Sequence, residues 1–204
     1  TDKRIRDWQL VAEYAEMRPV LRRHLSDLFS HGVLAARDGG DRGGFARRYR
    51  DEQEMDPQII LKVTGRAWHK KSRYGALIGR YPGDGENLAE TYASDFDAVD
   101  QVKLVNSGLN SLEIFGKQTA PQWSKEEIAA LVLAAGRKNR KVMVHANGAL
   151  PVRLAVDGGC HSIEHGFFMG RENLQLMAEK GTFWVPTVFT MKAYGMNIHA
   201  AQQG

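Results

Sequence analysis

Short apolar runs alternate with longer helical stretches along most of this chain, and this alternation limits the possible folds more than any other feature. Runs of strand length are predicted over residues 33–37, 58–64, 102–106, 141–146, 161–165 and 182–188. Helical patterns lie between them, over about 45–55, 86–99, 124–139, 150–156 and 171–180, and a further helix begins after residue 188. Strands that alternate with helices in this way are typical of βα units with a parallel sheet. We therefore expect an α/β fold with six strands in series.

Two segments stand outside this repeat. Apolar residues at helical spacing predict an opening helix from Ile5 to Ser30, with a kink near Pro19. The segment 65–85 holds five glycines together with aromatic and cationic residues. Such a composition predicts a long functional loop without regular structure.

Composition limits the classes of partner. With 204 residues, 43% of them hydrophobic, the chain is long enough for one globular domain. The basic run 47–50 is interpreted as a solvated helix face, and no nucleic-acid partner is expected. No apolar stretch approaches the roughly 18 residues of a membrane span. Cys160 is the only cysteine, which excludes an internal disulfide and permits a reducing compartment, so the location stays open with the cytoplasm slightly favoured.

Three predicted strands end in side chains that can bind a metal ion. These are Lys103 in Val-Lys-Leu-Val-Asn, His145 in Val-Met-Val-His-Ala, and His165 in Ser-Ile-Glu-His-Gly. Functional groups of parallel β/α arrays gather at the carboxyl ends of the strands, and strand alternation directs His145 toward the interior. A histidine alone is more often hydrogen-bonded in a core. Two histidines at successive strand ends, each followed closely by glycine, instead favour a metal site.

The same residues carry a resemblance to a known family. The segments 145–148, 157–166 and 184–187 resemble the fifth to seventh strands of the amidohydrolase superfamily, and 32–40 resembles its second strand. The most similar branch contains imidazolonepropionase-like proteins and Xaa-Pro or Xaa-Arg dipeptidases. The resemblance implies a TIM-type (β/α) barrel, present here incompletely from about strand two to strand seven.

The resemblance also implies a chemistry. His145 and His165 would bind a divalent metal, most often zinc, and Lys103 stands where dipeptidase-like members carry a lysine that reacts with carbon dioxide. The resulting carbamate bridges two metal ions in those proteins. Burial between apolar neighbours lowers a lysine pKa and so supplies the neutral amine that this reaction needs. The alternative is an unmodified Lys103 whose amine reaches solvent at the strand end.

The chain departs from the family pattern in two places. The family has a His-x-His pair on its first strand and an aspartate on its eighth, whereas none of the seven histidines here lies two residues from another. We therefore expect a single partial barrel domain that lacks the first and last strands and the terminal β-sandwich. Such a chain would hold half a metal site and show negligible hydrolysis alone. Its open sheet edges make a homo-oligomer possible.

Substrate-binding candidates come from the segment 65–85. Cationic and phenolic side chains there could hold the carboxylate of a small-molecule or dipeptide-like substrate, although most loop arginines are simply solvated. These candidates are His69, Tyr74, Arg80 and Tyr81. Strand alternation predicts that Glu164 faces the helices, opposite His165.

Three functions compete at this point. The first is a metal-dependent hydrolase that cleaves amide- or peptide-type C–N bonds with a metal-activated water. The second is a mononuclear cyclic-amide hydrolase or deaminase of the same superfamily, with Lys103 unmodified. The third is a non-catalytic barrel protein.

Overall fold

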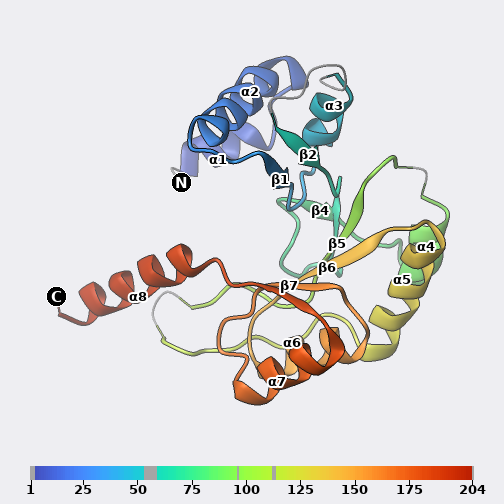
Figure 1. The fold of residues 1–204 in the computed structure, drawn as a ribbon, viewed down its shortest axis with the longest axis vertical. Helices are drawn as coiled ribbons and strands as arrows, with labels where there is room; N and C mark the ends of the chain where they lie inside the picture. Colours follow the sequence, from blue (N-terminus) through green and yellow to red (C-terminus); the bar gives the residue numbers. More distant parts are fainter. Residues whose placement is uncertain (1–2, 53–58, 96, 112–113, 204) are drawn as a thin grey trace.

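The structure, a computed structural model, describes residues 3–52, 59–95, 97–111 and 114–203. Parallel strands form its centre and helices cover one side of the longer sheet (Figure 1). The helices are α1 (Lys3–Gln9), α2 (Tyr14–Ser30), α3 (Phe45–Glu52), α4 (Leu88–Ala93), α5 (Lys125–Arg137), α6 (Ala149–Asp157), α7 (Arg171–Lys180) and α8 (Val188–Gln203). The strands are β1 (Ala35–Arg37), β2 (Ile60–Lys62), β3 (Ala67–Trp68), β4 (Gly79–Arg80), β5 (Gln101–Val105), β6 (Lys141–Ala146), β7 (Ser162–His165) and β8 (Phe183–Val185).

The strands form two sheets that adjoin each other. β1 pairs with β2, and the longer sheet has the order β4-β3-β5-β6-β7-β8, with every pairing parallel. The carbonyl of Val63, just after β2, accepts hydrogen bonds from Asp100 N (2.9 Å) and Gln101 N (3.3 Å) at the start of β5. The prediction of parallel βα units is confirmed. Among the strands that the structure describes, β8 pairs with β7 alone and no pairing joins it to β1, β2 or β4, so they do not form a closed barrel.

Strand alternation places the core on one face of the longer sheet. Val102, Leu104, Val142, Val144 and Ile163 are at most 2% exposed and pack with the apolar side chains of α4 to α7. Because α4 to α7 cover this face, the alternate residues of β5, β6 and β7 point to the opposite face. That face therefore has to accommodate the polar side chains of these strands.

The prediction of one opening helix from Ile5 to Ser30 is wrong, because the structure has two helices, α1 and α2, in its place. The amides of Val11 and Ala12 turn back to Trp8 O, at 3.0 and 2.9 Å, which closes α1. The amide of Glu13 then donates to Glu16 Oε2 (2.8 Å) at the start of α2. Pro19 lies inside α2 instead of marking the break.

The segment 65–85 is also more ordered than its composition predicts. It contains β3 and β4, which pair in parallel with Ala67 beside Gly79. A Cβ on Gly79 would collide with the carbonyl oxygen of Ala67, so the glycine permits the close approach of the two strands.

Other helices and strands begin or end at residues that differ from the predicted ones. Asn87 caps α4 by accepting from Ala89 N (2.9 Å), and the helix ends at Ala93, well before the predicted end at residue 99. β8 ends at Val185, and α8 begins at Val188. The predicted end of the helix at 45–55 and the start of the strand at 58–64 fall at residues 53–58, outside the described residues. None of the helices within the described part of the chain has the length and apolar character of a membrane span.

Candidate metal centre

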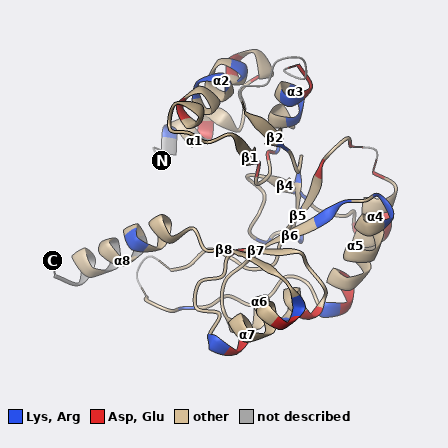
Figure 2. Ribbon diagram, viewed as in Figure 1, with Lys and Arg blue, Asp and Glu red and all other residues tan. Residues whose placement is uncertain are grey.

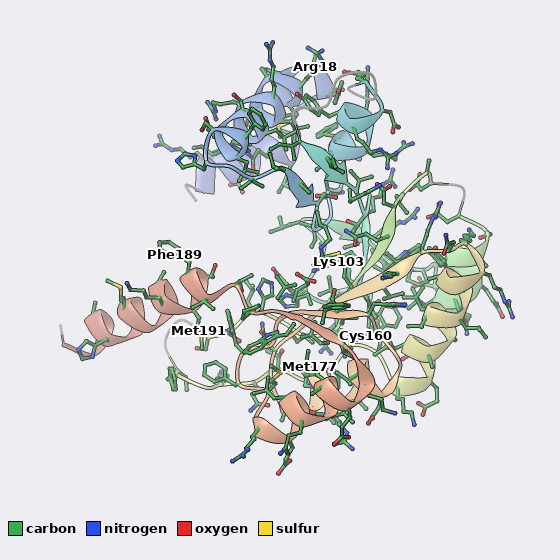
Figure 3. All side chains as sticks on the ribbon, viewed as in Figure 1. Arg18, Lys103, Cys160, Met177, Phe189 and Met191 are labelled. Carbon is green, nitrogen blue, oxygen red and sulfur yellow. The ribbon has the colours of Figure 1, made fainter. Side chains whose placement is uncertain are left out.

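An open pocket of about 410 Å³ lies on the polar face of the longer sheet, where β1 approaches β5 to β8. Figure 3 labels Lys103 at this junction, between the helical N-terminal part and the strands of the longer sheet. The polar side chains of its wall come from five separate segments of the chain. They are Arg37, Tyr74, Lys103, His145, Glu164 and His165.

Sheet register explains how these side chains meet. Lys103 pairs with Met143 and Met143 with Ser162, while His145, two residues further along β6, pairs with Glu164. Register partners of neighbouring parallel strands point to the same face. Lys103 therefore occupies one layer of the interior face, and His145 and Glu164 occupy the next.

The imidazoles of His145 and His165 face each other, with ring centroids 4.9 Å apart and an interplanar angle of 72°. Nε2 of His145 lies 3.2 Å from Gly108 O, and because a carbonyl only accepts, Nε2 carries the hydrogen and Nδ1 keeps its lone pair. Nδ1 of His165 lies 2.8 Å from Thr187 Oγ1, and in the tautomer in which Nδ1 donates to this hydroxyl, Nε2 keeps the lone pair that can bind a metal. Such contacts fix ring orientation in metal sites.

His165 reaches this position through an unusual backbone conformation. Its φ is 71°, in the left-handed region that non-glycine residues seldom occupy. Trp184 Nε1 donates to its carbonyl (2.9 Å), and Gly166 N donates to Ala146 O (3.1 Å). The prediction that Glu164 faces the helices is wrong: as the register partner of His145 it lies on the interior face, and the left-handed turn brings the next residue, His165, to the same pocket.

Burial sets the protonation of this cluster. It lowers the pKa of His145 to about 3, and burial together with the nearby Lys103 holds the pKa of His165 below its ordinary value. Burial also lowers the pKa of Lys103 to about 8, against the opposing effect of Glu164. Both imidazoles are therefore neutral at pH 7, and Lys103 is far more often neutral than an exposed lysine.

The predicted substrate residues separate into two groups. Tyr74 lines the pocket, and its ring centroid lies 5.3 Å from that of His145. His69 is 2% exposed and packs edge-on against Tyr81, with centroids 5.6 Å apart. Arg80 forms ion pairs with Asp95 and Asp97 and lies over the Trp68 ring. Only Tyr74 among the four lies in the pocket wall.

Two pocket-region contacts were missed from the sequence. Arg37 Nη2 donates to Glu164 Oε1 at 3.1 Å, and Thr187 contacts the His165 ring. Arg37 ends a predicted strand and precedes Asp38-Gly39-Gly40, and this position is the signal that could have identified it. Thr187 has no such local signal, because its role depends on where β8 lies.

The donor set fits part of a metal centre. Two neutral imidazoles supply two nitrogen donors, whereas zinc sites use at least three protein ligands. Among the described residues, no group of three or more His, Cys, Asp or Glu forms a metal site. Lys103 and Glu164 lie in the same pocket wall.

Comparison with known sequences gives partial matches. No family model matches the chain. An ochratoxinase of Aspergillus niger is 39% identical over 66 residues, which is 32% of this chain and 14% of that protein. An uncharacterized protein of Mycobacterium tuberculosis is 30% identical over 166 residues, which is 80% of this chain and 42% of that protein.

Solved structures match nearly the whole chain. A Xaa-Pro dipeptidase with methionine bound in its active site has a TM-score of 0.73 and 26% identity, over 87% of this chain and 48% of its own. The A. niger ochratoxinase has a TM-score of 0.73 at 20% identity, over 94% of this chain and 52% of its own, which supports the fold alone. The chain thus spans about half the length of these structures. The shared fold, together with the sequence similarity to the dipeptidase, supports the predicted resemblance to the amidohydrolase superfamily.

Proposed function

We propose that this chain supplies one side of the metal centre of a hydrolase that cleaves amide- or peptide-type C–N bonds. The observation that carries the proposal is the pair of neutral imidazoles, 4.9 Å apart, in one pocket with a buried lysine. The relatives named above include a Xaa-Pro dipeptidase and an ochratoxinase. The proposed substrate is a small molecule or dipeptide-like compound.

His145 and His165 would hold a divalent cation, most often zinc in such sites. A cation of this kind supplies a nucleophilic water at neutral pH and polarises the scissile carbonyl. Gly108 O and Thr187 Oγ1 orient the two rings, so that Nδ1 of His145 and Nε2 of His165 are the donors.

Lys103 would contribute through a carbamate. Its neutral amine nitrogen attacks the carbon of carbon dioxide and releases one proton, which leaves an anionic oxygen donor on the side chain. Burial favours this step because it lowers the pKa of Lys103 to about 8. An unmodified Lys103 would instead correspond to the mononuclear alternative, and the number of metal ions per chain distinguishes the two.

Tyr74 is the proposed substrate contact in the pocket wall. Its ring lies beside His145, so its phenol can donate to a substrate oxygen near the metal centre. His69 and Tyr81 pack against each other and Arg80 pairs with Asp95 and Asp97, so the structure gives these three less support as substrate contacts than Tyr74.

Zinc titration against a competing chelator tests the proposal. We expect the His145→Ala and His165→Ala variants to lose at least about tenfold in zinc affinity, because each removes one nitrogen donor. His24→Ala is the matched control, since His24 is exposed on α2. Unchanged zinc affinity in both pocket variants would contradict the metal centre.

Two further measurements address the lysine and the reaction. With ¹³C-labelled carbon dioxide, we expect a carbamate signal from the wild-type chain and none from Lys103→Gln. Because the described donors make only part of a centre, we expect negligible hydrolysis of dipeptides by this chain alone. Robust turnover by the purified chain would refute the partial centre.

A further inference from the structure

We propose that Arg37 and Glu164 act as a positioning pair, which crosses the interior from β1 to β7 and holds the strand end from which His165 turns into the metal centre. This inference rests on the proposed function. It adds two residues that bind neither metal nor substrate and act through His165.

The contact joins strands that are not neighbours in either sheet. β1 pairs with β2, whereas β7 lies between β6 and β8. Arg37 Nη2 nevertheless donates to Glu164 Oε1 at 3.1 Å, and Nη1 lies 3.5 Å from Ser162 Oγ. Ser162 Oγ also donates to Glu164 Oε1, at 2.9 Å. Both ends of the guanidinium therefore point to β7.

Glu164 is adjacent to one histidine across the sheet and to the other along the chain. It is the register partner of His145 and the chain neighbour of His165. Fixing its carboxylate fixes the last extended residue before the left-handed turn at His165. A strained conformation of this kind persists only where several contacts hold it.

The contacts of His165 hold the other side of that turn. Its ring nitrogen contacts Thr187 (2.8 Å), and Trp184 Nε1 donates to its carbonyl (2.9 Å). If Glu164 were released, an extended backbone at His165 would place the ring on the face opposite to that of Glu164. The imidazole would then leave His145, so the pair controls the distance between the two donors.

The Glu164 carboxylate is buried and the Arg37 guanidinium is partly exposed. The Glu164 side chain is 9% exposed, so its charge is poorly solvated and needs the guanidinium. Arg37 is 39% exposed and opens toward the pocket, which means that it can be substituted without removing a core side chain.

The test compares this pair with a surface pair of the same chemistry. Arg37→Met, Glu164→Gln and the double variant are measured beside Arg153→Met, which breaks an exposed ion pair to Asp157 on α6. Zinc affinity, thermal midpoint and the ¹⁵N chemical shifts of the imidazoles are recorded for each. Glu164→Gln is the milder change, because its amide oxygen can still accept a hydrogen bond.

We expect each single pocket variant to lose about tenfold to 100-fold in zinc affinity, as is typical when the supporting contacts of a metal ligand are removed. The double variant should lose little more than the worse single variant, and Arg37→Lys should recover part of the loss. Arg153→Met should leave zinc affinity unchanged. The ¹⁵N shifts of His165 should change even in the metal-free chain.

Unchanged zinc affinity and unchanged His165 shifts, with a lowered thermal midpoint, would overturn the inference and reduce the pair to a structural brace. Failure of the proposed function looks different. In that case the wild-type chain binds no zinc, while the His165 shifts of the metal-free variants still reveal whether the pair positions the ring.

Discussion

The region from β5 to α7 and the region from α1 to α3 are stabilised by different interactions. The first holds most of the apolar core, in which residues such as Leu104, Ile128 and Leu131 are fully buried. In the second, Glu52 accepts from Tyr14 Oη (2.7 Å) and Arg18 Nε (2.9 Å) and pairs with Arg48 (3.4 Å). Figure 2 shows the basic and acidic segments along α2 and α3.

This difference bears on the candidate site. Apolar burial is non-directional and little affected by salt, whereas exposed ion pairs are weak and are screened by it. Lys103, His145 and His165 stand on strands of the apolar region, while Arg37 enters from the charged region. The site therefore joins a rigid part of the molecule to one whose stability depends on solution conditions.

The largest expected effect tests the apolar region. Leu131→Ala should lower the free energy of unfolding by about 3 kcal/mol, because it opens a cavity in the core. Leu133→Ala on the same helix is the control: Leu133 is 61% exposed, and its loss should cost less than about 0.5 kcal/mol. Urea unfolding followed by tryptophan fluorescence measures both. Equal losses would mean that the burial pattern of α5 is wrong.

A smaller effect is expected at the junction of the two regions. The Asp100 carboxylate accepts from Arg50 (2.6 Å) and Val63 N (2.9 Å), so Asp100→Asn should cost about 1–2 kcal/mol at pH 7. Burial alone would raise the pKa of Asp100, but these bonds outweigh it and hold the pKa below its ordinary value of 3.8.

The sign of the pH dependence follows from that lowered pKa. The contribution of Asp100 is fully present above about pH 4 and is lost as the pH falls through the lower folded-state value. Denaturant curves of wild type and Asp100→Asn should therefore differ at pH 7 and converge in more acidic solution. A difference that grows on acidification would exclude this account.

A local effect of about 1 kcal/mol is expected at the start of α5. Ser124 Oγ accepts from Glu127 N (3.2 Å), and Ser124 N donates to Glu127 Oε2 (2.7 Å). Ser124→Ala removes one half of this capping box and should destabilise the chain by that amount. Thermal unfolding measures the loss, and Ser124→Thr, which keeps the hydroxyl, should restore most of it.

The smallest effect belongs to the charged region. Glu52→Gln should increase amide hydrogen exchange in α2 and α3 because it weakens three contacts made by the carboxylate. About 0.5 M NaCl should produce a similar increase in the wild-type chain by screening the ion pairs. Amides of α5 serve as the internal control. Equal acceleration in α5 would show that the two regions do not differ as described.

Local patterns predicted much of the fold and part of the site. The central strands, the capping box at Ser124 and the positions of His145 and His165 near strand ends follow from residue spacing, whereas Lys103 lies in the middle of β5 and not at its end as predicted. The interior location of Glu164 was not predictable in this way, because two consecutive residues of a regular strand point to opposite faces. A single left-handed φ at His165 changes that rule.

The sequence by itself determined where strands and helices alternate and which strands carry side chains that could bind a metal, because hydrophobic period and capping act within a few residues. Only the tertiary structure decided that Arg37 meets Glu164 across 127 positions of sequence and that Thr187 orients the ring of His165. Those contacts depend on sheet register and on one backbone dihedral, and both are set by packing between segments that lie far apart along the chain.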